Sequence, residues 1–212
     1  MLARKLLAAL VLICLFSAPA MAANVVDEKK PAVGAHVYYS WVPNGFLDMG
    51  YEEHTSLSSL AYGVWTSYGF GAYDLQLRVS NWSIFIDDGI WRSQGGTLKD
   101  QFYVETNGFG LLDLDLSVLW KWRVHEAVEP YVGPTVGMGF FYGELTVDDY
   151  YDQGDLRGSR KHKPETKNIP PVVPIAGFMG GCRFYPMPNM RLSVDLGFAN
   201  GFYGGLSAGY AF

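Results

Sequence analysis

Hydrophobic and polar residues alternate with a period of two along several stretches of the chain. Between Leu112 and Trp122, apolar side chains occupy every second position, and Asp113, Asp115 and Lys121 fall between them. A β-strand places alternate side chains on opposite faces, whereas a helix would spread these charges around its circumference. The pattern therefore predicts strands with one apolar face and one polar face.

The same period predicts eight strands. We expect them at residues 32–42, 58–68, 73–86, 109–122, 130–145, 170–185, 190–199 and 203–212. Short turns are expected at 69–72, 123–129 and 186–189. Long polar loops are expected at 43–57, 87–108 and 146–169, with a shorter one at 199–202. Turns and long loops alternate from start to finish, which is typical of transmembrane β-barrels.

The apolar faces decide how such strands pack. A tilted strand of about 9–11 residues crosses a bilayer, and an open sheet edge is not stable in lipid. An all-β, closed, antiparallel up-and-down barrel with its apolar face outwards satisfies both conditions. Eight strands leave an interior just wide enough for side chains, so we expect a mostly filled lumen. Its polar network is expected to contain Arg78, Asp113, Asp115, Lys121, Arg183 and Asp195.

The first 23 residues have a different character. Arg4 and Lys5 precede an apolar run from Leu6 to Phe16, and small residues surround Met21. This order of regions is typical of a cleaved secretory signal peptide. We therefore expect residues 1–23 to be removed on export and residues 24–212 to form the barrel domain.

Charge and cysteine content narrow the function classes. Residues 1–23 hold two of the 16 basic residues and none of the 21 acidic ones, so the remainder carries a formal net charge of −7. This balance argues against a nucleic-acid partner. Cys182 is the only cysteine left, so no internal disulfide forms, and the four histidines lack zinc spacing. We expect no cofactor and no metal.

The C-terminal residues resemble a known assembly signal. Leu206, Ala208, Tyr210 and Phe212 alternate on one strand face and end in an aromatic residue. This pattern resembles the β-signal of bacterial outer-membrane proteins. The segment 129–137 also looks like the opening of a fifth strand in small barrels of the OmpA, OmpX and OmpW type. The resemblance implies integration into the outer membrane of a Gram-negative bacterium, through the barrel-assembly machinery.

Three functions remain open for a protein of this kind. The first is a structural or surface-interaction role in which the barrel displays its long loops. The second is a narrow channel for small or hydrophobic molecules. The third is a lipid A-modifying enzyme. A pair such as His36 and Ser40 resembles part of the His–Ser–acid set that lipid A deacylases carry on their outer wall, but here both residues are expected to point inwards. The first role is favoured, without catalytic residues.

The third long loop is rich in charge. Its acidic first half is followed by a basic run, for which the alternatives are solvated surface, pairing within the loop, and contact with phosphates of the outer leaflet. The residues that could bind lipopolysaccharide are Arg157, Arg160, Lys161 and Lys163. We expect outer-membrane lipids and lipopolysaccharide to be the main partners of a monomer.

Overall fold

The computed structural model describes residues 30–96, 101–149, 165–166, 172–199 and 201–212. These described residues form one short helix, α2 (Asn44–Leu47), and eleven strands. The strands are β1 (Pro31–Trp41), β2 (Tyr51–Glu53), β3 (Leu57–Phe70), β4 (Tyr73–Ile86), β5 (Gly89–Ser93), β6 (Gln101–Lys121), β7 (Val128–Asp149), β8 (Glu165–Thr166), β9 (Val172–Met187), β10 (Met190–Phe198) and β11 (Phe202–Ala211). Among the described residues, no helix has the length and apolarity to span a membrane.

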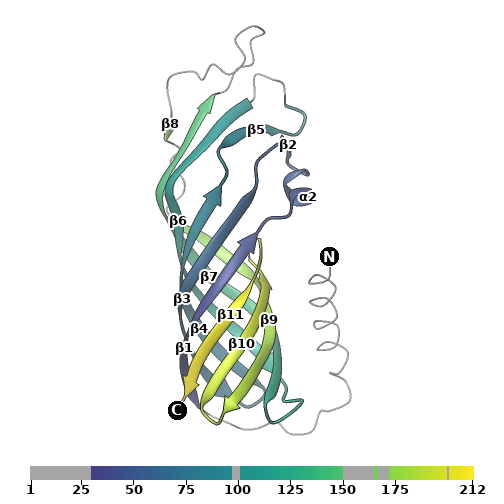
Figure 1. The fold of residues 1–212 in the computed structure, drawn as a ribbon, viewed down its shortest axis with the longest axis vertical. Helices are drawn as coiled ribbons and strands as arrows, with labels where there is room; N and C mark the ends of the chain where they lie inside the picture. The colour runs from purple at the N-terminus through teal and green to yellow at the C-terminus, as the bar shows by residue number, and fades with distance from the viewer. Residues whose placement is uncertain (1–29, 97–100, 150–164, 167–171, 200) are drawn as a thin grey trace.

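Eight of these strands close into an antiparallel barrel, which confirms the predicted fold class. Their order around the barrel is β1, β3, β4, β6, β7, β9, β10 and β11. The ring is completed where β11 returns to β1, with Ala211 opposite Ala32. The strands slant across the lower part of the molecule, and the C-terminus lies at the same end as the short turns (Figure 1).

The outer wall of the barrel is apolar and carries aromatic groups at two levels. Near the short turns, Phe70 stacks on Tyr73 with ring centroids 5.5 Å apart. At the opposite end, where β1, β10 and β11 stop, Phe202 packs against Trp41, Phe46 and Phe198 at 5.1–6.3 Å. Aromatic belts at the two membrane–water interfaces bracket the lipid-facing band in barrels of this kind. The side chains between the belts therefore face lipid.

Glycines let one large side chain enter the narrow barrel. Trp65 points inwards from β3 and is 7% exposed, in contact with Ala32 and Ala211. A Cβ atom on Gly34 or on Gly209 would lie 2.4–2.5 Å from the Trp65 ring. The indole therefore occupies the space that side chains at these two positions would need.

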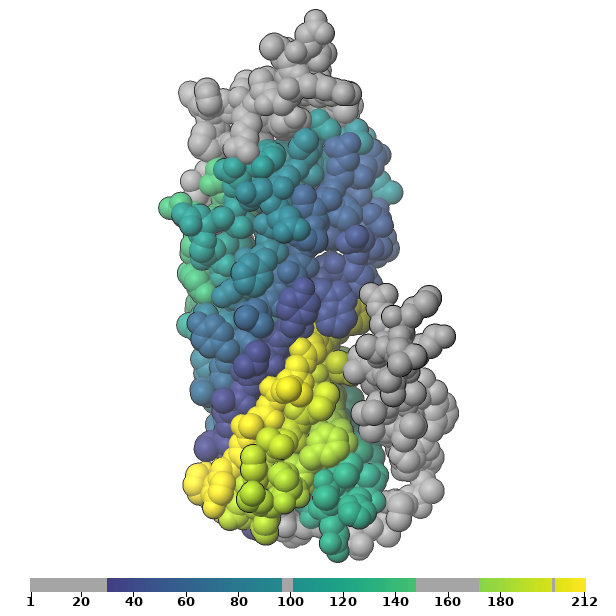
Figure 2. Space-filling view, in the orientation of Figure 1, coloured from purple at the N-terminus to yellow at the C-terminus, as the bar shows by residue number. Residues whose placement is uncertain are grey.

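The walls of the barrel have unequal heights. Strands β10 and β11 have 9 and 10 residues, whereas β6 and β7 have 21 and 22. Since about 9–11 residues suffice to cross a bilayer, roughly half of β6 and β7 extends beyond the barrel on the side opposite the short turns. Figure 2 shows β11 (yellow) ending well below the top of the blue and teal strands.

The long loops predicted at 43–57, 87–108 and 146–169 were wrong in part. The first contains α2 and β2, the second contains β5 and the start of β6, and the third begins with the end of β7 and includes β8. Strand β5 pairs with both β2 and β6, so the described parts of these segments form a folded extension of the sheet. Leu47, Trp91 and Val104 form its apolar cluster. These segments were predicted as loops because they have no long period-two alternation of apolar residues, yet burial of this small cluster is enough to order them.

Candidate functional site: the barrel interior

The interior of the barrel is lined by alternate residues of all eight strands. Its lower part, next to the short turns, holds an ion-pair cluster drawn from β4, β6, β7 and β9. Arg183 contacts both Asp74 and Glu129, with 3.0 Å between its Nη1 and Glu129 Oε1. Lys121 Nζ lies 2.7 Å from the other oxygen of Asp74, which is fully buried. Each charge in this cluster has a partner, which offsets the cost of burying it.

A second set of contacts lies above this cluster. Arg78 donates from Nε to Asp115 Oδ1 at 2.9 Å, and both side chains are at most 5% exposed. Tyr38 donates to Asp195 at 2.8 Å, and Tyr131 donates to the other oxygen of the same carboxylate. These groups come from β1, β4, β6, β7 and β10, so the contacts cross the lumen.

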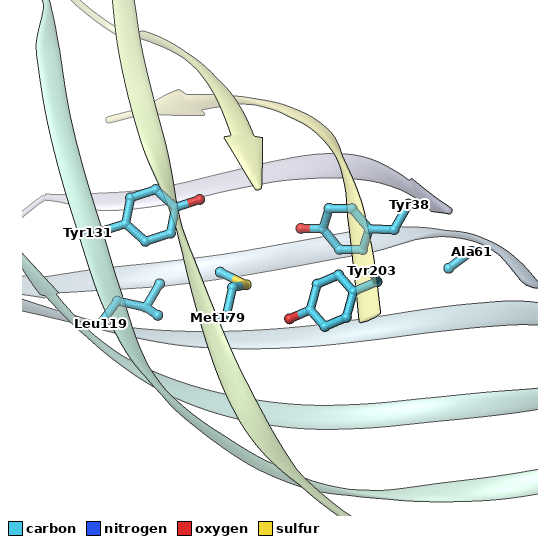
Figure 3. Packing of buried hydrophobic residues seen from close by; sticks show 6 residues of the cluster. All are labelled: Tyr38, Ala61, Leu119, Tyr131, Met179 and Tyr203. Atoms are coloured by element: carbon cyan, nitrogen blue, oxygen red, sulfur yellow. The ribbon is translucent and has the colours of Figure 1, made fainter. Parts of the chain in front are cut away.

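An apolar cluster accompanies these polar contacts. It consists of Tyr38, Ala61, Leu119, Tyr131, Met179 and Tyr203, all at most 4% exposed. Figure 3 shows Met179 between the Tyr131–Leu119 pair and the Tyr38–Tyr203 pair, so that side chains from opposite walls approach one another across the barrel. We refer to these six residues as the central cluster.

All six polar residues expected in the lumen point into it. They do not form one network. Lys121 and Arg183 belong to the lower cluster, Arg78 and Asp115 pair with each other, and Asp195 accepts from tyrosines. Asp113 lies two residues from Asp115 on the inner face of β6 and accepts from Trp82 Nε1 at 3.3 Å.

Sequence reasoning missed several interior residues. They are Asp74 and Glu129, which hold the lower cluster together, and Tyr131, which donates to Asp195. Asp74 continues the alternation of Gln76 and Arg78, which was the available signal. Glu129 stood in a segment predicted to be a turn.

His36 also lies in the interior, as expected. Its Nε2 is 3.1 Å from Ser80 Oγ, and its ring stacks on Tyr38 with centroids 4.5 Å apart. Ser40 is further along β1 and lines a cavity described below. No group of three or more His, Cys, Asp or Glu side chains able to hold a metal ion occurs among the described residues.

The C-terminal segment places Leu206, Ala208, Tyr210 and Phe212 on the outer wall. Leu206 and Phe212 are 63% and 65% exposed, and Tyr210 packs edge-on against Phe212 at 5.3 Å. The backbone N–H of Phe212 donates to the Pro31 carbonyl at 3.0 Å. Recognition of this segment by the assembly machinery stays a prediction.

A cavity of about 280 Å³ occupies the upper part of the barrel, beyond the central cluster. We call it the upper chamber. Its walls are mostly aliphatic and aromatic, and Asp113 is the charged residue in them. The chamber touches the central cluster through Trp82 and Ala199, and it touches the apolar cluster of the extension through Val42, Leu57 and Ile86.

Solved structures share this architecture. The structure of Ail, the attachment invasion locus protein of Yersinia pestis, aligns with a TM-score of 0.51 at 11% identity over 87% of this chain and 99% of that one. The fold is that of a small outer-membrane β-barrel. Neisserial surface protein A (TM-score 0.46, 16% identity, 86% and 94% covered) and the N-terminal barrel domain of Pseudomonas aeruginosa OprF (0.42, 13%, 86% and 97%) also match. No family model and no curated protein matches the sequence.

The location of the barrel follows from its surface. An apolar outer wall between two aromatic belts, with charges turned inwards, is the arrangement of outer-membrane barrels, and a closed sheet leaves no unpaired edge in lipid. The protein is therefore an integral protein of the bacterial outer membrane. In barrels of this class the short turns lie on the periplasmic side and the longer connections lie outside the cell, and we expect the same orientation here.

Proposed function

We propose that the protein anchors and presents its extracellular extension at the cell surface and that its barrel does not conduct. The observation that carries this proposal is the filling of the lumen at the level of the central cluster. The largest side chains less than 2% exposed are Tyr38, Leu119, Met179, Asp74, Asp195, Ser80 and Ser117. They come from β1, β4, β6, β9 and β10, so water does not reach side chains on several sides of the barrel.

The extension supports a role in presentation. Strands β5 and β6 pair from Gly89–Val104 to Arg92–Gln101. Arg92 Nη2 lies 3.1 Å and 3.2 Å from carboxylate oxygens of Glu52 and Glu53. The described part of the extension is thus an ordered, hydrogen-bonded surface that continues the barrel wall, suited to contact a partner without first folding.

Conductance measurements test the filled lumen. Purified protein in planar bilayers is expected to give no steady single-channel current, with a general porin as the positive control. Reproducible unitary currents would refute the proposal and favour the narrow channel instead.

Surface labelling tests the presentation. In a Cys182→Ala background, Met49→Cys in the extension should react with a membrane-impermeant maleimide on intact cells. Glu126→Cys in a short turn should react only after the outer membrane is permeabilised. Equal labelling of both positions on intact cells, or labelling of Glu126→Cys alone, would contradict the orientation.

Two partner assignments remain proposals. The basic run expected to contact lipopolysaccharide, namely Arg157, Arg160, Lys161 and Lys163, lies outside the described residues. The proposal of a monomer is tested by the mass of the detergent-solubilised protein in multi-angle light scattering. An enzymatic role on lipid A finds no support in His36, whose side chain is 97% buried inside the barrel, away from the lipid-facing wall.

A further inference from the structure

We propose that the upper chamber is a binding site for a small uncharged molecule that has an apolar body and one hydroxyl or carbonyl group. The chamber encloses about 280 Å³, whereas protein interiors contain few voids larger than a water molecule. Its apolar walls include Leu57, Ile84, Phe109, Leu111, Phe141 and Ile175. Side chains around such a space gain packing contacts when an apolar molecule occupies it.

The walls offer no free charge to a ligand. Asp113 is the charged residue in them, but its carboxyl is not available for binding. Its Oδ2 accepts from Trp82 Nε1, and its Oδ1 is fully buried. An ionised ligand would therefore lose its hydration without forming an ion pair in return, which is costly in an apolar site. The chamber thus selects uncharged molecules.

Two serines give one side of the chamber hydrogen-bonding groups. Ser40 on β1 and Ser59 on β3 line the space and lie opposite each other in the sheet. Both are half-buried, and neither hydroxyl forms a hydrogen bond with another described residue. A serine hydroxyl both donates and accepts. A single ligand oxygen on this side can therefore bond with either serine while the rest of the ligand contacts the apolar walls.

The size and position of the chamber limit the ligand further. A cavity of about 150 Å³ in another protein holds benzene, so this chamber fits roughly ten non-hydrogen atoms. Val42 and Ala199 line it and stand just beyond the upper ends of β1 and β10, so the chamber reaches the rim of the barrel where its wall is lowest. The central cluster packs against Trp82 and Ala199 and closes the floor. A ligand therefore binds without passing through the barrel, and the proposal does not depend on the anchoring role.

Methyl NMR on the complete barrel in nanodiscs tests the site, with 2-phenylethanol as the probe. The methyls of Ile84, Ile86 and Ile175, which line the chamber, should shift on titration and reach saturation. The methyls of Leu114, which is exposed on the outer wall of β6, report alcohol dissolved in the lipid and should not saturate. Equal, unsaturated shifts of both sets would overturn the proposal, as would no shift of the isoleucine methyls.

Phenethylamine tests the selection against charge. It has the same apolar body as 2-phenylethanol and is protonated at neutral pH, so it should bind at least about tenfold more weakly than the alcohol. Equal or tighter binding of the amine would overturn the proposal.

A matched pair of substitutions tests the location of the site. Ser59→Leu fills part of the chamber, whereas Ser83→Leu makes the same change on the outer wall, where Ser83 pairs with the exposed Leu60. Ser59→Leu should weaken 2-phenylethanol binding at least about tenfold, and Ser83→Leu should leave it unchanged. Ala199→Leu fills the chamber from another side and should act as Ser59→Leu does, which keeps the test valid if one variant fails to fold. Unchanged affinity in either filling variant that folds, or an equal loss in Ser83→Leu, would overturn the proposal.

The double variant Ser40→Ala/Ser59→Ala tests the contact with the ligand oxygen. It keeps the space and removes both hydroxyls, so it should weaken 2-phenylethanol binding about two- to tenfold, as expected for the loss of one hydrogen bond. Unchanged affinity in this variant would overturn the proposal.

Discussion

The Arg78–Asp115 pair allows a direct test of how the interior is held together. Replacing Arg78 with Met keeps much of the side-chain volume and removes the cation. Asp115 then remains buried without its partner, with Asp113 two residues away on the same face. Breaking one side of a buried pair costs about 3–5 kcal/mol. We expect a value near the upper end, because Arg78 also lies over the rings of Tyr38 and Tyr203 at 5.7 and 6.0 Å.

The double variant Arg78→Met/Asp115→Leu should recover most of this loss. Replacing a buried ion pair with apolar side chains of similar volume is often neutral or stabilising by about 1–4 kcal/mol. The single and double variants therefore separate the cost of an isolated carboxylate from the net contribution of the pair.

The assay is reversible urea unfolding in lipid vesicles, followed by tryptophan fluorescence and by heat-modifiable migration on gels. Arg92→Met is the matched control. Its ion-pair partners Glu52 and Glu53 are 40% and 41% exposed, so this variant should lose less than about 1 kcal/mol. Equal losses for Arg78→Met and Arg92→Met would refute the reasoning, as would a double variant no more stable than Arg78→Met alone.

Three further predictions concern the outer wall, the chain end and the extension. Leu114→Arg places a charge on the lipid-facing wall of β6 and should lower stability in vesicles by about 2–4 kcal/mol, whereas Leu114→Met stays near wild type. Deleting Phe212 should reduce the amount of folded, heat-modifiable protein in outer membranes and leave misfolded protein in the periplasm, whereas Phe212→Tyr should assemble normally. Normal assembly of the deletion variant would contradict the assembly-signal role. The hydrogen bond from His54 to Asp48 raises the pKa of His54 above 6.5. This hydrogen bond therefore stabilises the extension fully below pH 6.5, and the stabilisation is lost as the pH rises through the higher pKa. NMR titration of Asp48→Asn should show a lower His54 pKa than in the wild type.

The barrel strands could be predicted from the sequence because the outer wall that faces lipid is apolar along its whole height. Every strand that crosses the membrane needs alternate apolar residues over its whole length, which gives a signal in each one. The extension lacks this requirement. Trp91 and Val104 pack on Leu47 from a four-residue helix, and so few buried positions leave no readable period.

The pairing inside the lumen could not be predicted either. Alternation tells which residues point inwards, but partners depend on the offset between strands around the barrel. Arg183 on β9 reaches Asp74 on β4, although these two strands are not neighbours in the sheet.

The closure of the ring between β1 and β11 has a consequence for folding kinetics. Ala32, near the start of the described chain, pairs with Ala211, at its end. Contacts between positions so distant in sequence carry the largest loop-closure cost and form slowly. The last strand must arrive before the first can complete its hydrogen bonds, so the chain remains an open sheet until then. Protection of this unfinished edge by a chaperone should therefore determine the yield of folded barrel more strongly than the stability of the finished product.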